Sequence, residues 1–225
     1  GGGMDLKFPH HENEIAQTCA ACDSPFVNVW MHNGFVRVDD EKMSKSLGNF
    51  FTVREVLEWV RDPEVVRYFM VNSQYRGPIN YTPDSLAQAD AALERLYTSL
   101  RGVPVVALQA PTKATERFVT AMDDDFNTPI AVSELQALAR EVNTAKAAGD
   151  LDKAAALAAE MRVLGARLGL LGLEPEVFLR KHAAKQASET GVAGSTEAAS
   201  AVPSLADADI ERLIDERAAA RKSKN

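Results

Sequence analysis

The distribution of hydrophobic positions divides the chain into two parts that meet near residue 82. Before this point, short apolar runs alternate with Gly, Pro and polar residues, a pattern typical of mixed strands and helices. After it, apolar residues recur every three or four positions from Leu86 to Leu100, which places them on one helix face. We therefore predict an α/β part followed by an all-α helical bundle.

The first 80 residues are predicted to form short elements joined by turns. Pro9 suits the first turn of a helix over about residues 10–22, because the amide that proline lacks would be unpaired there. A capping-box pattern at Thr52 and Glu55 begins a second helix, and Asp62-Pro63 begins a third. The other predicted segments are strands over 26–31 and 35–38, a polar loop over 39–49 and a connector over 74–82.

The second part carries almost no strand signal after residue 106. Thr82-Pro83 and Thr128-Pro129 are each an N-cap residue followed by proline, so each begins a helix, the second over 129–147. Further helices are expected at about 112–122, 151–169, 174–181 and 205–222. The resulting segments are residues 1–50, 51–81, 82–182, a flexible Ala-, Ser-, Thr- and Gly-rich linker over 183–203, and residues 204–225.

Composition and charge limit the classes of function. The chain has 225 residues, of which 46% are hydrophobic and 25% charged, as in a globular protein of one or two domains. No apolar run approaches the roughly 18 residues of a membrane span, and no signal peptide is evident. Two cysteines do not make a secreted disulfide framework, so we expect a cytoplasmic protein. The net charge of −7 argues weakly against nucleic acid but leaves room for a local patch.

The sharpest local motif is Lys42-Met43-Ser44-Lys45-Ser46, which lies in the predicted polar loop. Flexible lysines can follow the charge that develops on phosphates during nucleotidyl transfer, and Met43 could anchor the loop to the domain surface. For lysine-rich loops in general, a solvated loop without a catalytic role is the competing interpretation.

His10 and Glu14 lie four residues apart near a helix start and therefore share a face, with His11 beside them. This spacing suits two ligands of one zinc ion, although a plain surface His–Glu pair is the more frequent alternative. Cys19 and Cys22 form a C-x-x-C pair further along the helix. Because Glu14 and Cys22 are about 12 Å apart along the helix axis, we do not expect the cysteines to join this ion. We expect them to pack in the core.

Three further residues are candidates for substrate contacts. Asp5 follows three glycines, and a Gly-rich turn at a strand end faces the ligand crevice of a Rossmann-type sheet. Asp5 could therefore pair with the ammonium group of an amino acid, or it could simply cap the turn. Trp30 and His32 alternate along a predicted strand, so both face one side, which is either an active site or the core.

The acidic run Asp123-Asp124-Asp125 could be taken for a metal cluster. We interpret it instead as negative charge near the N-terminus of the helix that Pro129 begins, where it stabilises the helix dipole.

Residues Lys42 to Ser46, followed by Leu47-Gly48-Asn49, resemble the second signature of class I aminoacyl-tRNA synthetases. The segment 1–17 and the run 123–129 narrow this resemblance to the cysteinyl-tRNA synthetases, over most of residues 1–180. The resemblance implies the end of a Rossmann-type catalytic domain over 1–50 and stem-contact helices over 51–81. It further implies a tRNA-binding bundle over 82–182 and the start of an anticodon-binding region at 204–225.

The resemblance also implies a reaction. Cysteine and ATP, with Mg²⁺, would give cysteinyl-adenylate and pyrophosphate, and the cysteinyl group would then pass to the terminal ribose of tRNA(Cys). Lys45, supported by Lys42, would stabilise the triphosphate, and Ser44 and Ser46 would lie in the same ATP site. The family's soft zinc ion would select the cysteine thiolate over the hydroxyl of serine.

The resemblance assigns His10 and Glu14 as two of the zinc ligands and Asp5 as the partner of the substrate ammonium group. Trp30 and His32 stay substrate-contact candidates from their alternation along the predicted strand. The chain departs from the family because the first class I signature, the first half of the Rossmann fold and two upstream zinc cysteines are absent. It also stops before the family's anticodon-reading end. We therefore expect a monomeric partial chain that is inactive by itself.

Two alternative functions remain open from the sequence. One is a cysteine ligase of the mycothiol pathway, which activates cysteine in the same way and delivers it to an amino sugar. The other is a non-catalytic RNA- or zinc-binding module.

Overall fold

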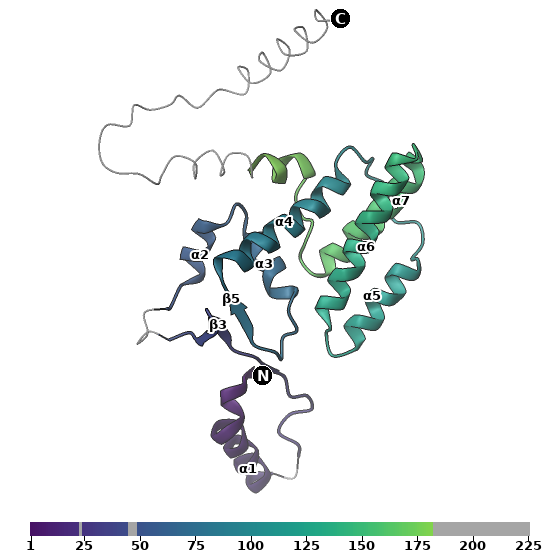
Figure 1. Cartoon of the computed structure of the whole chain (residues 1–225). Helices are drawn as coiled ribbons and strands as arrows, with labels where there is room; N and C mark the ends of the chain where they lie inside the picture. The colour runs from purple at the N-terminus through teal and green to yellow at the C-terminus, as the bar shows by residue number, and fades with distance from the viewer. Residues whose placement is uncertain (23, 45–48, 182–225) are drawn as a thin grey trace, which may run out of the picture. The chain divides into compact units, whose positions relative to one another are not determined.

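The structure of the protein is a computed structural model that describes residues 1–22, 24–44 and 49–181. The predicted linker over 183–203 and the predicted helix over 205–222 lie outside the described residues. Figure 1 shows short strands and helices in the first part of the chain and long helices in the second. The predicted order, an α/β part followed by a helical bundle, is confirmed. No helix of the described part is long and apolar enough to cross a membrane.

The chain begins with a two-stranded parallel sheet, in which β1 (Gly2–Gly3) pairs with β2 (His32–Asn33). Between the strands run a 3₁₀ helix (Met4–Leu6), a π-helical turn (Lys7–His11) and α1 (Glu12–Ala21). The helix predicted over 10–22 is thus confirmed, whereas the strand predicted over 26–31 is wrong. Since the chain turns into the 3₁₀ helix at Met4, β1 offers only two residues for pairing, and these meet His32 and Asn33.

A three-stranded sheet follows, with the order β4 (Glu41–Lys42), β3 (Val36–Val38), β5 (Ile79–Tyr81). The predicted strand at 35–38 is confirmed as β3, which pairs antiparallel with β4 and parallel with β5. Strand β5 lies in the segment predicted to be a connector, and β4 in the predicted loop. Such short strands carry too few residues for a periodic signal, and it is their pairing with β3 that forms them.

The two sheets are linked by a close approach of backbone at Gly34. Its amide donates to the carbonyl of Tyr75 over 2.8 Å. A Cβ atom at Gly34 would lie 1.9 Å from the carbonyl oxygen of Gly77, which is backbone and cannot rotate away. Only glycine fits here. Gly34 therefore allows the chain between β2 and β3 to lie directly against the loop that precedes β5.

Two short helices separate these strands. The predicted capping box is confirmed at α2 (Val53–Trp59), where Thr52 accepts from the amide of Glu55 and the Glu55 carboxylate accepts from the amide of Thr52. At α3 (Pro63–Val71), the Asp62 carboxylate accepts from the amide of Glu64 over 2.9 Å. Both helix starts follow from local sequence, as predicted.

The bundle consists of α4 (Pro83–Leu100), α5 (Lys113–Asp123), α6 (Thr128–Ala147) and α7 (Leu151–Arg167), and residues 175–181 are also helical. The five helices predicted between residues 82 and 181 are confirmed. Their apolar faces form one core, in which the rings of Tyr97 and Phe178 stack with centroids 4.1 Å apart. The large side chains with the lowest exposure in this core include Tyr68, Leu93, Leu96, Leu100, Leu135, Leu138 and Met161.

The acidic run Asp123-Asp124-Asp125 was predicted to stabilise the dipole of α6, but not all three residues have this role. Asp123 is the last residue of α5, and Asp125, at a φ of 53°, forms an ion pair with Arg76 and accepts from the Tyr75 hydroxyl over 2.7 Å. The Arg76 guanidinium lowers the pKa of Asp125. Asp125 therefore attaches the bundle to the loop before β5, which the sequence spacing alone does not reveal.

Charged residues at the corner between α2 and α3 reach into the bundle. The Arg61 guanidinium donates to the Asp90 carboxylate and carbonyl and to the Glu94 carboxylate, and it lies 4.3 Å from the centroid of the Phe178 ring. The Glu64 carboxylate accepts from the Tyr97 hydroxyl over 2.7 Å. These contacts join the corner to α4 and to the segment after α7.

A second buried carboxylate, that of Glu160, caps the N-terminus of α5. Glu160 of α7 is 1% exposed and accepts from the amide and hydroxyl of Thr112 and from the amide and hydroxyl of Thr115. Four donors satisfy the carboxylate, and its charge is favourable at a helix N-terminus. Glu160 thus fixes the start of α5 against α7.

We expect Glu160→Ala to lower the free energy of unfolding by about 3 kcal/mol, because the buried amides and hydroxyls at the start of α5 lose their acceptor. Urea unfolding followed by circular dichroism measures this loss. The control is Glu141→Ala, at an exposed glutamate of α6, for which we expect a change within about 0.5 kcal/mol. Equal effects of the two substitutions would contradict the capping role of Glu160.

We expect Glu64→Gln to change the pH dependence of stability. Burial raises the pKa of Glu64, so its stabilising contribution is present below the ordinary carboxyl pKa and is lost as pH rises through the folded value. A neutral glutamine has no such dependence. Urea unfolding from about pH 4 to about pH 8 should therefore show the variant gaining stability relative to the parent as pH rises. A constant difference would contradict the raised pKa.

Candidate functional site

A cluster of aromatic and imidazole rings lies beside the first sheet. The rings of Trp30 and His32 are stacked, with centroids 5.9 Å apart and planes inclined by 5°. His11 packs against both, with its ring centroid 4.9 Å from that of Trp30. The prediction that Trp30 and His32 share a side is confirmed, and His11 joins them from the turn before α1.

The two histidines of this cluster share a hydrogen bond. His11 Nδ1 lies 2.9 Å from His32 Nε2, so one ring donates and the other must be unprotonated at the shared position. His32 is 6% exposed. Burial lowers the pKa of His32, and the neighbouring charges of His11 and Lys7 lower it further. The pair can therefore hold a single proton between two rings at the end of β1.

Asp5 lies in the 3₁₀ helix that directly follows β1, as expected for a residue at the carboxyl end of a strand. Its side chain folds back over the strand, because a Cβ atom at Gly3 would lie only 2.4 Å from Asp5 Oδ1. A Cβ atom at Gly2 would similarly lie 2.6 Å from Leu6 Cδ1. The glycines thus allow an exposed carboxylate to lie close to the strand backbone, where a cationic group could reach it.

The two predicted zinc ligands are accessible. His10 lies in the π-helical turn and Glu14 in the first turn of α1, and both are exposed. Within residues 1–22, 24–44 and 49–181, no group of three or more His, Cys, Asp or Glu side chains could hold a metal ion. The described chain therefore offers two donors of suitable chemistry, which is half of a tetrahedral zinc site, and it does not complete that site.

The two cysteines do not pack in the core as predicted. Both Cys19 and Cys22 are exposed free thiols. The prediction fails because α1 has no buried residue, and Ile15 of its apolar stripe is only half-buried.

The lysine- and serine-containing loop is fixed at its base. Lys42 is the last residue of β4, and its Nζ lies 4.5 Å from the centroid of the Phe35 ring. The amide of Ser44 donates to Asn49 Oδ1 over 2.9 Å, and the Asn49 side-chain amide lies within 3.4 Å of the Lys42 carbonyl. Asn49 thus closes the loop across its two ends. Lys45 and Ser46, the other predicted ATP contacts, lie outside the described residues.

Met43 has the anchoring role that the sequence indicated. Its half-buried side chain packs against a small core made by Val38, Tyr81 and Leu86. Because Tyr81 belongs to β5 and Leu86 to α4, the loop rests on elements that lie about forty residues further along the chain.

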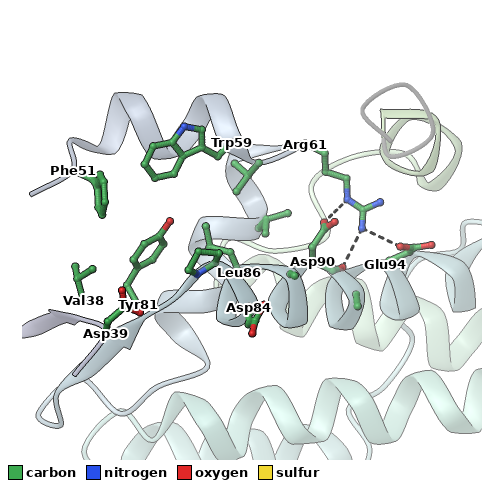
Figure 2. Close-up of a pocket in the computed structure, with 15 residues that line it drawn as sticks. Val38, Asp39, Phe51, Trp59, Arg61, Tyr81, Asp84, Leu86, Asp90 and Glu94 are labelled. Carbon is green, nitrogen blue, oxygen red and sulfur yellow. Dashed lines mark hydrogen bonds and ion pairs between the residues drawn. The ribbon is translucent and has the colours of Figure 1, made fainter. Parts of the chain in front are cut away.

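Beside this small core lies a cavity of about 860 Å³. Figure 2 shows Phe51, Trp59 and Tyr81 at one end and the Arg61 guanidinium with its acidic partners at the other. Burial raises the pKa of the Tyr81 hydroxyl. None of the described residues that the sequence predicted as site residues lines the cavity. The cavity is therefore not the predicted site.

The structure thus groups some predicted residues and leaves others apart. It brings Trp30 and His32 together and places Asp5 at the end of the strand that pairs with β2. The sequence predicted no role for His11 beyond a place near the zinc ligands, and none for Asn49 beyond its place in the motif. An amide residue directly after a glycine-containing loop is the signal by which Asn49 could have been found.

Comparison with known proteins relates the chain to class I tRNA synthetases. Residues 1–91 match the family described as tRNA synthetases class I (C) catalytic domain, and residues 117–172 match the DALR domain. Over the whole chain, 52% of residues are identical to a cysteine–tRNA ligase of Halorhodospira halophila and 54% to one of Methylococcus capsulatus. Over its whole length the chain is thus homologous to proteins named cysteine–tRNA ligase.

The chain spans about half the length of the curated relatives that it matches. It covers 44% of the Halorhodospira halophila ligase, 45% of the Methylococcus capsulatus ligase and 48% of a Nitrosococcus oceani ligase that is 50% identical. Among solved structures, the LeuRS of Agrobacterium radiobacter K84, in a ternary complex with tRNA and LeuAMS, has a TM-score of 0.55 at 20% identity. That match covers 86% of this chain and 27% of the LeuRS chain, and it supports the class I fold.

We expect the His32 ring to titrate below the ordinary histidine pKa of 6.5. Because burial disfavours its charged form, the stability that this neutral ring contributes is present above the ordinary pKa and is lost as pH falls through the folded value. NMR titration of the imidazole signals, assigned with His32→Gln, measures the midpoint. In His11→Gln the His32 midpoint should rise, because one positive neighbour is removed. A parent midpoint at or above 6.5 would contradict the buried, paired state.

Proposed function

We propose that this chain supplies part of the machinery of a cysteine–tRNA ligase, which activates cysteine with ATP and transfers it to tRNA(Cys). The observation that carries the proposal is the 50–54% identity, over the whole chain, to proteins named cysteine–tRNA ligase. At this level the relatives agree in name, and none of the three relatives cited has a name that supports a mycothiol-pathway ligase or a non-catalytic module. Because the chain spans about half of each relative, the activity is proposed for a protein of the relatives' length.

In this proposal the loop after β4 binds the phosphates of ATP, which enters with Mg²⁺. Lys42 lies at the base of the loop, where the bonds between Ser44, Asn49 and the Lys42 carbonyl fix its two ends. In the sequence, Lys45 directly follows Ser44, and Ser46 comes next. A lysine ammonium beside the phosphates would stabilise the charge that develops as pyrophosphate leaves.

The amino acid would bind beside the first sheet. The exposed Asp5 carboxylate at the end of β1 would pair with the substrate ammonium group. Trp30 and His32 would form one wall of the pocket, where the stacked rings are kept in place by the hydrogen bond to His11. This arrangement supports a small, partly apolar pocket at the carboxyl end of parallel strands, the usual ligand position in such folds.

His10 and Glu14 would contribute two ligands to the family's zinc ion. Zinc, when bound, would supply a soft Lewis acid that prefers a thiolate to a hydroxyl. No group of three or more such donors lies among the described residues, so the selection of cysteine would depend on further ligands. The contribution of this chain is to hold both donors on one accessible face at the start of α1.

The helices from α4 to α7 would contact the tRNA, and the protein would act as a cytoplasmic monomer. Within them, the DALR match over residues 117–172 covers α6 and α7 and most of α5. This match supports a role outside the catalytic domain.

The test uses a chimaeric enzyme in which this chain replaces the matching region of the Halorhodospira halophila ligase. We expect Lys45→Ala to reduce cysteine-dependent ATP–pyrophosphate exchange by about 100-fold, because the leaving phosphates lose a positive partner. Cysteine binding, measured by calorimetry, should remain unchanged. The matched control is Lys113→Ala at an exposed lysine of α5, which should leave exchange intact.

The same chimaera tests the second half of the reaction. Radiolabelled cysteine should be transferred to tRNA(Cys) and not to an amino sugar. Exchange that survives Lys45→Ala would refute the role of the loop, and transfer to the sugar would refute the tRNA substrate.

A further inference from the structure

The C-x-x-C pair at the end of α1 has no part in the proposed function. Cys19 lies in the last turn of the helix, and Cys22 is its C-cap residue. Both thiols are free and exposed, and they are the two cysteines of the sequence. No residue of α1 is buried, so small oxidants in solution can reach this helix end.

The backbone places the two residues at a distance that a disulfide can bridge. Residues three apart in an α-helix have Cα atoms about 5 Å apart, which follows from the rise per residue and the helix radius. Disulfides join Cα atoms that are about 4.4–6.8 Å apart. Ala21, the residue before Cys22, is still helical, and the Cys22 amide donates to the Thr18 carbonyl over 2.9 Å. The pair therefore keeps helical spacing.

The Cys22 side chain is directed back along the helix. Its Sγ lies 3.4 Å from the Thr18 carbonyl oxygen, and Thr18 is the residue next to Cys19. The same Sγ lies 3.4 Å from Ser24 Oγ. Hydrogen bonds from Ser24 lower the pKa of the Cys22 thiol, which increases the fraction of thiolate, the form that reacts with oxidants.

We propose that Cys19 and Cys22 form a redox modification site, in which hydrogen peroxide converts the two thiols into an intrachain disulfide. The Cys22 thiolate attacks one peroxide oxygen, the O–O bond breaks, and the products are a Cys22 sulfenic acid and, after protonation, water. The Cys19 thiol then attacks the Cys22 sulfur, the S–O bond breaks, and a second water leaves. Two electrons pass from the two thiols to one peroxide molecule.

Such a disulfide is reversible, as expected for a pair in a reducing compartment. A small thiol such as reduced glutathione attacks one sulfur of the disulfide, and a second molecule resolves the mixed disulfide and becomes oxidised. The proposal concerns an exposed pair outside the amino acid and ATP sites, so it stands independently of the proposed function.

The test treats the reduced 225-residue chain with hydrogen peroxide, then alkylates the remaining thiols and measures the mass. We expect an unalkylated monomer whose tryptic peptide 8–37, which contains both cysteines, has lost two hydrogen atoms. Reduced glutathione should restore both alkylation sites. A disulfide-linked dimer, or two thiols that stay alkylatable or advance to sulfinic acid, would overturn the intrachain site.

Two comparisons test whether the fold contributes. The native chain should form the disulfide about threefold faster than the same chain in urea, since the helix holds the two residues at bridging distance. Ser24→Ala should slow the reaction by about threefold, because it removes the hydroxyl hydrogen bond that favours the thiolate. The matched control Ser133→Ala, at an exposed serine of α6, should not change the rate. Equal rates with and without urea would show that sequence spacing alone is responsible and would overturn the structural argument.

Discussion

Three charged side chains at the corner between α2 and α3 form the contact on which the described structure depends. Arg61, Asp62 and Glu64 are removed from water, and a buried charge is tolerated only when it is paired or hydrogen-bonded. Their partners lie on α4, after α7 and at residue 181, so these charges cannot be satisfied unless the corner and the bundle meet. The buried pairs therefore contribute less to net stability than to the choice of one arrangement.

This junction extends to the loop that carries the lysines. After α3 the chain forms β5, which pairs with β3, and β3 continues into β4 and Lys42. Met43 packs on Tyr81 of β5 and Leu86 of α4, so the base of the loop rests on the same elements that the buried charges fix. The loop between Ser44 and Asn49 thus begins and ends on a rigid support, which suits lysines that must approach a transferring phosphate.

The first sheet and α1 follow a different principle. Here no apolar core is formed among the described residues of α1, and polar contacts and glycine backbone determine the geometry. The stacked Trp30 and His32, the bond from His11 and the fold of Asp5 over Gly3 bring together residues from three short segments. Exposed His10, Glu14, Cys19 and Cys22 leave α1 as a helix whose chemistry lies on its surface.

The amino-acid sequence is sufficient to predict the features that depend on near neighbours in the chain. These are the helix starts at Thr52, Asp62 and Thr82, the amphipathic faces of the bundle and the lysine motif, since caps and periodicity act over a few residues. Four features emerge only in the folded chain: the two-residue pairing of His32 with β1, strand β5, the ion pair of Asp125 with Arg76, and the exposure of Cys19 and Cys22. Each of these depends on a partner far along the chain, or on the lack of one, and local pattern carries no record of it.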